Sequence, residues 1–237
     1  MTDGAEHPAP RRETPRGNGP TPPFAPKPPP AFNVPPATLG LILVLIGVFA
    51  VLHLLPIGMV QDAVITFGFI PLRLALALAG DHPLAPALWP LVTHMLIHLD
   101  LLHLMVNLGF TLAFASPVER RCGSAGFLAL FIACGVAGAL FMMIPVTQPI
   151  GAYGPSIGAS GGVFGLMGVA LAARLENPRV RLKPGRAILA LFVLNLVIGL
   201  LSEAGLTGGY RIAWMAHTGG FLTGLVIGWA LRRRSFG

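Results

Sequence analysis

Charged side chains are scarce in this chain: Asp, Glu, Lys and Arg make up 11% of its 237 residues, whereas 54% are hydrophobic. An ordinary soluble domain carries about 25% charged residues, so the composition excludes a typical water-soluble enzyme or binding module. Cysteine is also rare, because Cys122 and Cys134 are the only two, too few for the disulfide framework of a small secreted domain. The sequence therefore predicts a membrane protein.

Long apolar runs predict membrane-spanning helices, since about 20 apolar residues cross a hydrocarbon layer of ~30 Å. Six runs lie near residues 38–55, 88–116, 125–146, 157–173, 187–201 and 212–231. A further apolar segment, 63–80, contains Pro71 and Arg73, and we interpret it as an interfacial or re-entrant element of the first loop. The predicted fold class is an all-α membrane protein, a bundle of six transmembrane helices with an interfacial first loop.

The positions of the basic residues predict the orientation of these spans, because Lys and Arg accumulate on the cytoplasmic side. Of the 16 basic residues, all except Arg73 and Arg211 lie in the N-terminal tail, the 2–3 loop, the 4–5 loop or the C-terminal tail. This pattern predicts cytoplasmic N- and C-termini. Topology and attraction to an anionic lipid leaflet explain the net charge of +7, so no nucleic-acid partner is needed.

The N-terminal segment differs in composition from the rest of the chain. Residues 1–36 contain many of the prolines and no apolar run, so we expect a disordered, Pro-rich cytoplasmic tail. Nothing in it resembles a cleaved signal peptide. Residues 37–237 are predicted to form one six-span domain with a short basic C-terminal tail, and a bacterial inner (plasma) membrane fits this organisation best.

Polar residues within the predicted spans are candidates for function, because each is costly in a membrane and usually faces a protein interior or a water-filled cavity. Those in or beside the spans are His94, His98, Asp100, His103, Asn107, Ser156, Ser160, Asn195, Glu203 and His217. His94 and His98 are four residues apart, as are His103 and Asn107, so each pair is expected to share a helix face.

Two overlapping G-x-S-x-G patterns in "GPSIGASGG" make Ser156 and Ser160 candidate nucleophiles. Helical spacing aligns small residues along two predicted spans, and such stripes let membrane helices approach closely. The stripes are Gly161, Gly165, Gly168 and Ala172 in one span, and Gly220 and Gly224 beside His217 in the other. If the two stripes pack together, Ser160 and His217 face each other at similar depth. The same spacings also fit a non-catalytic alternative, in which Ser160 is a small packing residue and His217 hydrogen-bonds a backbone carbonyl.

Three segments resemble those of one known family, the rhomboid intramembrane serine proteases. "GASGGVFGLMG" is similar to its G-x-S-G segment, "HLDLLHLMVN" to its H-x-x-x-x-H-x-x-x-N segment, and "AHTGGFLTG" to its A-H-x-x-G-x-x-x-G segment. They follow the family's order on spans 2, 4 and 6, and the likeness covers about residues 38–231. The resemblance implies an intramembrane serine endopeptidase that hydrolyses peptide bonds in or near transmembrane segments of other proteins in the lipid bilayer, without a cofactor or metal.

The resemblance also implies roles for individual residues. Ser160 would be the nucleophile and His217 the general base of a Ser–His dyad, with His103, Asn107 and the Ser160 N–H forming the oxyanion hole. Ser156 follows Pro155 in the loop before the helix, a position that favours capping or loop hydrogen bonding over catalysis. Supporting positions are Phe164, which could stack on the His217 ring, Gly158, Gly220 and Gly224, together with His94 and His98 as hydrogen-bonding supports near the first loop.

Other classes fit less well. A zinc intramembrane protease requires an H-E-x-x-H helix, which this sequence lacks. An aspartyl intramembrane protease needs two buried aspartates, whereas Asp62, Asp81 and Asp100 lie in or beside the first loop. A metal transporter using the histidines of span 2 would need further ligands across the membrane. The main alternative is a rhomboid-like pseudoprotease that binds membrane-protein clients without cleavage; such proteins generally lack the Ser or the His.

Overall fold

The computed structural model describes residues 33–144, 154–173, 184–203 and 213–233. Residues 34–237 belong to one compact unit, and the described parts of it are mostly helical. Residues 1–32 of the predicted tail lie outside the described residues. Helix α1 (Pro36–Leu54) begins at Pro36. By length and hydropathy, α1 could cross a membrane.

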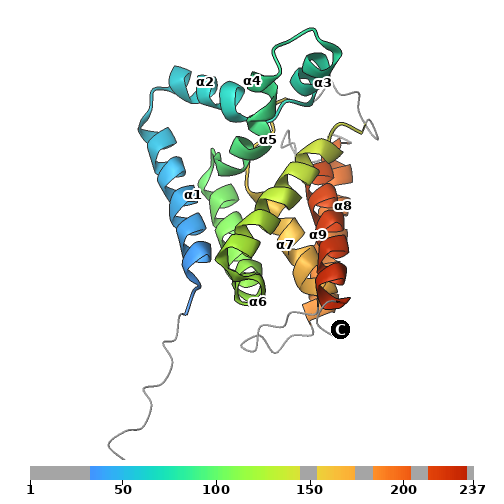
Figure 1. Ribbon diagram of the computed structural model, residues 1–237. Helices are drawn as coiled ribbons and strands as arrows, with labels where there is room; N and C mark the ends of the chain where they lie inside the picture. Colours follow the sequence, from blue (N-terminus) through green and yellow to red (C-terminus); the bar gives the residue numbers. More distant parts are fainter. Residues whose placement is uncertain (1–32, 145–153, 174–183, 204–212, 234–237) are drawn as a thin grey trace, which may run out of the picture. The chain divides into compact units, whose positions relative to one another are not determined.

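Short helices follow α1 and gather at one end of the bundle (Figure 1). They are α2 (Ile57–Phe67), α3 (Pro71–Ala79), α4 (Ala85–Leu88), α5 (Pro90–Thr93) and the 3₁₀ turn η1 (His94–Leu96). A proline lies in the first turn of α3, α4 and α5, where the missing N–H is no loss. The predicted single element 63–80 is therefore divided between the end of α2 and all of α3.

The prediction of a span over 88–116 is wrong at its beginning. The long helix α6 (Leu101–Phe141) starts at Leu101, because the Asp100 side chain accepts a hydrogen bond of 2.6 Å from the backbone N–H of His103 and so caps the helix. His94 begins η1, and His98 lies beyond that turn. The two histidines consequently do not share a helix face, and the expectation that they do is wrong.

Helix α6 contains residues of both the second and the third predicted span. Gly123 interrupts its helical geometry with φ 74° and ψ 169°, a backbone conformation that glycine adopts without a steric penalty. The two legs on either side of Gly123 lie at an angle to each other (Figure 1). The loop predicted between two spans is thus reduced to a sharp turn at a single glycine.

The buried carboxylate of Glu119 joins α1 to this turn. Its oxygens accept hydrogen bonds from the backbone N–H groups of Ala37 (2.9 Å) and Thr38 (2.7 Å). They also accept from the hydroxyls of Thr38 (2.7 Å) and Ser124 (2.8 Å). The first N–H groups of a helix have no partner inside the helix, so Glu119 satisfies the start of α1 and holds it beside α6.

The centre of the bundle is α7 (Ser160–Ala172), which packs against α9 (Trp214–Arg233), while α8 (Pro184–Glu203) lies beside them (Figure 1). Glycines line the α7–α9 contact. A β-carbon at Gly220 would overlap the carbonyl of Gly161, and one at Gly224 would overlap the carbonyl of Gly165. The two backbones therefore touch directly along this face, as small-residue stripes allow.

Candidate active site

Ser160 and His217 lie at the starts of α7 and α9, at the end of the bundle near the short helices. His217 is in the first turn of α9, one turn before Gly220, and Ser160 is the first residue of α7. The Ser160 Oγ and the His217 Nε2 are 2.7 Å apart. This is hydrogen-bonding distance, and it lets an imidazole accept the hydroxyl proton.

A third polar side chain contacts the His217 imidazole on the side opposite Ser160. The Oδ1 of Asn195, in α8, is 2.5 Å from the His217 Nδ1. Sequence reasoning identified Asn195 as a polar residue within a span but gave it no role. A usable signal was present in the spacing, because Ile188, Asn195 and Gly199 fall on one helix face at intervals of seven and four. The structure buries all three.

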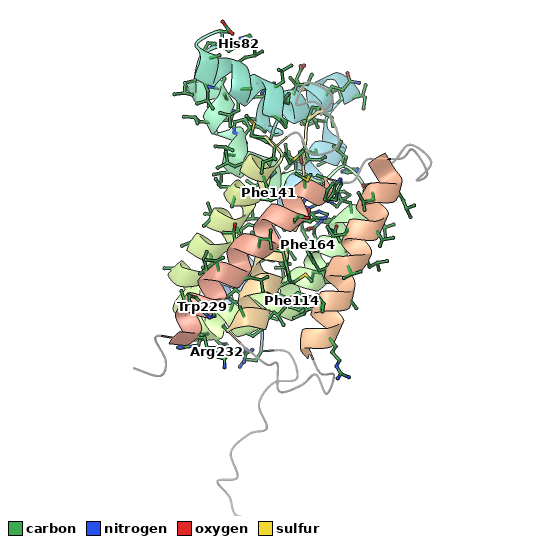
Figure 2. The ribbon with its side chains drawn as sticks, turned by 90° about the vertical axis from the view of Figure 1, so that its right-hand side faces the viewer. His82, Phe114, Phe141, Phe164, Trp229 and Arg232 are labelled. Carbon is green, nitrogen blue, oxygen red and sulfur yellow. The ribbon has the colours of Figure 1, made fainter. Side chains whose placement is uncertain are left out.

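The ring of Phe164 holds the imidazole from one side. Its centroid is 4.4 Å from that of His217, and the two ring planes differ by 1°. Phe164 follows Ser160 by one turn of α7, so a single helix supplies both the hydroxyl and the stacking surface. Figure 2 shows Phe164 inside the bundle, between Phe141 toward the short helices and Phe114 toward the opposite end.

The segment before Ser160 is fixed by backbone contacts with the first loop. Ser156 and Phe69 exchange two backbone hydrogen bonds of 2.8 and 2.9 Å, an isolated antiparallel bridge. Gly158 donates its N–H to the carbonyl of His94 at 2.9 Å. Gly158 has φ +112°, and a β-carbon there would overlap the His103 ring. Ser156 is thus part of the scaffold that presents Ser160, and a side chain at position 158 would disrupt it.

His98 also supports this segment. Its Nε2 accepts a hydrogen bond of 3.3 Å from the backbone N–H of Ala159. Burial lowers the pKa of His98 to about 4, with a smaller contribution from His103, so the ring is neutral at physiological pH and its Nε2 can act as an acceptor. The residue before the candidate nucleophile is therefore held by a histidine 61 positions earlier.

A cavity of about 720 Å³ surrounds the Ser160 hydroxyl. His103 and Asn107, on successive turns of α6, contribute to its wall together with the apolar side chains of Leu102, Val106 and Phe110. The Asn107 amide nitrogen donates to the His103 carbonyl at 2.9 Å, which uses one of its two hydrogens. Within the described part of the chain, the second hydrogen is left for a ligand of the cavity.

Comparison with known proteins identifies the family of this chain. The family profile of the Rhomboid domain matches residues 85–234, more than half of the chain. The chain belongs to the rhomboid family. Rhomboid proteins are integral to the membrane, and the mostly helical structure agrees with the rhomboid fold.

Several curated rhomboid proteins are similar to this chain. Rhomboid protease GluP of Bacillus subtilis is 31% identical over 136 residues, which cover 53% of this chain and 25% of that protein. RHOMBOID-like protein 5 of Arabidopsis thaliana is 31% identical over 149 residues, 62% of this chain and 45% of that protein. Rhomboid-like protease 3 of Toxoplasma gondii is 30% identical over 140 residues, 59% and 50% respectively. This chain thus spans between a quarter and a half of the length of these rhomboid relatives.

Proposed function

We propose that this rhomboid protein is an intramembrane serine endopeptidase that hydrolyses peptide bonds in or near transmembrane segments of other membrane proteins. The observation that carries the proposal is the 2.7 Å contact between the Ser160 Oγ and the His217 Nε2 inside a cavity large enough for a peptide segment. Two of the similar proteins described above are named proteases, which supports the same reaction class for this chain.

In the proposed reaction, the Ser160 Oγ attacks the scissile carbonyl carbon while His217 Nε2 takes the hydroxyl proton. The tetrahedral intermediate collapses when the imidazolium gives this proton to the leaving amine, and an acyl-enzyme remains. Water then attacks the acyl carbon, His217 accepts a proton from the water, and the new carboxyl end is released as Ser160 regains its hydrogen. The cycle consumes one water and leaves the enzyme unchanged.

The developing oxyanion needs hydrogen-bond donors, and the start of α7 provides the first. The N–H groups in the first turn of a helix have no intrahelical partner, and the helix dipole is positive at this end. Ser160 occupies this position. We assign further donors to the side chains of Asn107 and His103, which share the cavity wall. Such preorganised donors usually supply a large fraction of the rate enhancement.

The substrate proposed for this site is a transmembrane segment that unwinds locally. Within an intact helix the peptide carbonyls are hydrogen-bonded to the backbone, so Ser160 can reach one only where that bonding is broken. The apolar wall formed by Leu102, Val106 and Phe110 suits a hydrophobic segment. We further propose a bacterial plasma membrane location with both termini in the cytoplasm, residues 37–237 forming the catalytic domain behind a Pro-rich tail.

Replacing Asn107 by alanine is expected to lower kcat by up to about 10²-fold with little change in KM, because its amide contacts charge that develops in the transition state. The double variant His103→Ala/Asn107→Ala should lose more. Cleavage of a transmembrane reporter in proteoliposomes measures both constants. An unchanged kcat in the single and the double variant would remove these side chains from the oxyanion hole.

Covalent labelling tests the proposed function against a rhomboid-like pseudoprotease that only binds its clients. A fluorophosphonate should modify Ser160 in the folded wild type, since the adjacent imidazole can activate the hydroxyl. Ser160→Ala should remove the label. Ser156→Ala should keep it, because the bridge to Phe69 uses only backbone atoms. Absence of Ser160-dependent labelling in folded protein would favour the binding protein.

A further inference from the structure

We infer that Asn195 of α8 is a positioning residue: it orients the catalytic base His217 and fixes its proton on Nδ1, behind the reacting Ser160–His217 pair. The inference rests on the proposed function and adds a residue to it. It starts from one observation: the His217 imidazole lies between two polar side chains, with the Ser160 Oγ at its Nε2 and the Asn195 Oδ1 at its Nδ1.

Contacts on both sides of Asn195 hold α8 against the site. Toward the start of α8, the buried side chain of Ile188 packs in a cluster with Phe164 and Phe221. Toward its end, a β-carbon at Gly199 would overlap the Trp214 side chain, so the two helices are in close contact there. Asn195 lies between these points and is itself buried. Its amide is therefore presented to His217 by fixed packing.

The chemistry of the amide decides the tautomer. A carbonyl oxygen can only accept a hydrogen bond, so its neighbour Nδ1 carries the hydrogen and Nε2 keeps its lone pair toward Ser160. In the other tautomer, Nε2–H points at Ser160 and cannot take its proton. When His217 becomes an imidazolium in the transition state, the bond from Nδ1–H to Asn195 becomes charge-assisted and stronger. Asn195 thus stabilises the reacting state without bringing a charge into the membrane.

A neutral acceptor suits this site for a further reason. Among the residues that the structure describes, two titratable side chains line the cavity together with His217: His103 of α6, and Asp100, which caps α6 and accepts from the His103 N–H. The Asp100 carboxylate is therefore engaged at the start of α6, and the group bonded to the far nitrogen of His217 is the neutral amide of Asn195. The amide nitrogen of Asn195 is buried and has no hydrogen-bond partner in the described part of the chain. The hydrogen bond that holds this amide in the described part of the chain is therefore the one from its oxygen to His217.

Two substitutions separate positioning from packing. Asn195→Leu keeps the branched shape of the side chain but removes the acceptor, and we expect kcat to fall about 10- to 100-fold with KM unchanged, the effect of losing one hydrogen bond to a charged group. Asn195→Asp keeps the acceptor and should recover most of kcat. Because its carboxylate stabilises the imidazolium, the acidic limb of the pH–kcat profile should move to higher pH. Leu194→Ala, a neighbour with 52% of its surface exposed, is the matched control and should match wild type.

A spectroscopic measurement tests the tautomer without any need for cleavage. In ¹⁵N NMR of the Ser160→Ala protein, the His217 signals, identified by their loss in a His217→Gln sample, should show a hydrogen on Nδ1. Adding Asn195→Leu should shift them toward a mixture of tautomers. Folded variants are compared in the same detergent, and if Asn195→Leu does not fold, Asn195→Asp decides through its pH profile.

Two results would overturn the inference: wild-type kcat and pH profile in both Asn195 variants, or equal losses in both with an unmoved profile and an unchanged tautomer. Failure of the proposed function has a different signature. In that case wild type neither cleaves a reporter nor becomes labelled at Ser160, whereas the NMR result for His217 still reports on Asn195.

Discussion

Ser160→Ala and His217→Ala are each expected to abolish cleavage while leaving the bundle folded. Removing the nucleophile or the base of a serine protease typically costs about 10⁶-fold in kcat. Apart from the Ser160–His217 hydrogen bond and the stacking of Phe164 on His217, the α7–α9 contact is made by backbone atoms at the glycines, so the fold should survive. Initial rates on a transmembrane reporter in proteoliposomes, normalised to folded protein, measure the loss.

Thr218→Ala is the matched control for the histidine variant. Thr218 is the next residue of α9, and its hydroxyl donates to the Trp214 carbonyl, away from the cavity. Its removal should leave cleavage near the wild-type rate. If Ser160→Ala retained a rate comparable with wild type, the serine-protease assignment would be wrong, whatever the distance between the two side chains.

Gly220→Leu should reduce cleavage by more than about 10²-fold without touching a reacting group. The position has no room for a side chain, because a β-carbon would already overlap the Gly161 carbonyl. A leucine must therefore push α9 away from α7 and carry His217 with it, and a displacement of about 1 Å can cost ~10²-fold in rate. Overpacking should also lower stability by roughly 1–3 kcal/mol or more. Cleavage per folded molecule and the thermal midpoint in micelles measure the two effects.

Ala230→Leu introduces the same side chain into the same helix on an exposed face and should be close to neutral in both measurements. Gly224→Leu should resemble Gly220→Leu, since Gly224 meets the Gly165 carbonyl in the same way. Equal cleavage by Gly220→Leu and Ala230→Leu would mean that the distance between Ser160 and His217 does not depend on this face.

Local periodic patterns were enough to identify the α7–α9 face. The spacing of Gly220 and Gly224 repeats with the helix, and so does that of Gly161 and Gly165, so a helical register alone brings each set to one side. The structure brings Ser160 and His217 to 2.7 Å at the end of that face. The same register argument failed for His94, because it assumed a helix where a short proline-started helix, a 3₁₀ turn and the Asp100 cap interrupt it.

Contacts between distant segments were beyond the reach of such patterns. The hydrogen bond between Asn195 and His217 depends on how closely α8 packs against α7 and α9. That packing is set by side chains on all three helices. The bond from Ala159 to His98 likewise joins residues 61 positions apart. The sharp turn at Gly123 was also missed, since apolar composition indicates two spans but does not indicate how few residues join them.

The carboxylate of Glu119 has a consequence for how the protein is made. It satisfies the start of α1 from 81 positions further along the chain. A ribosome adds about 5–20 residues per second, so α1 leaves the ribosome several seconds before its partner exists. During that interval the N–H groups of Ala37 and Thr38 must bond to water or lipid headgroups. The packing of α1 against α6 is therefore completed in the order of synthesis: its contacts with the first turns of α6 can form early, and the capping bonds at its start only after Glu119 has been added.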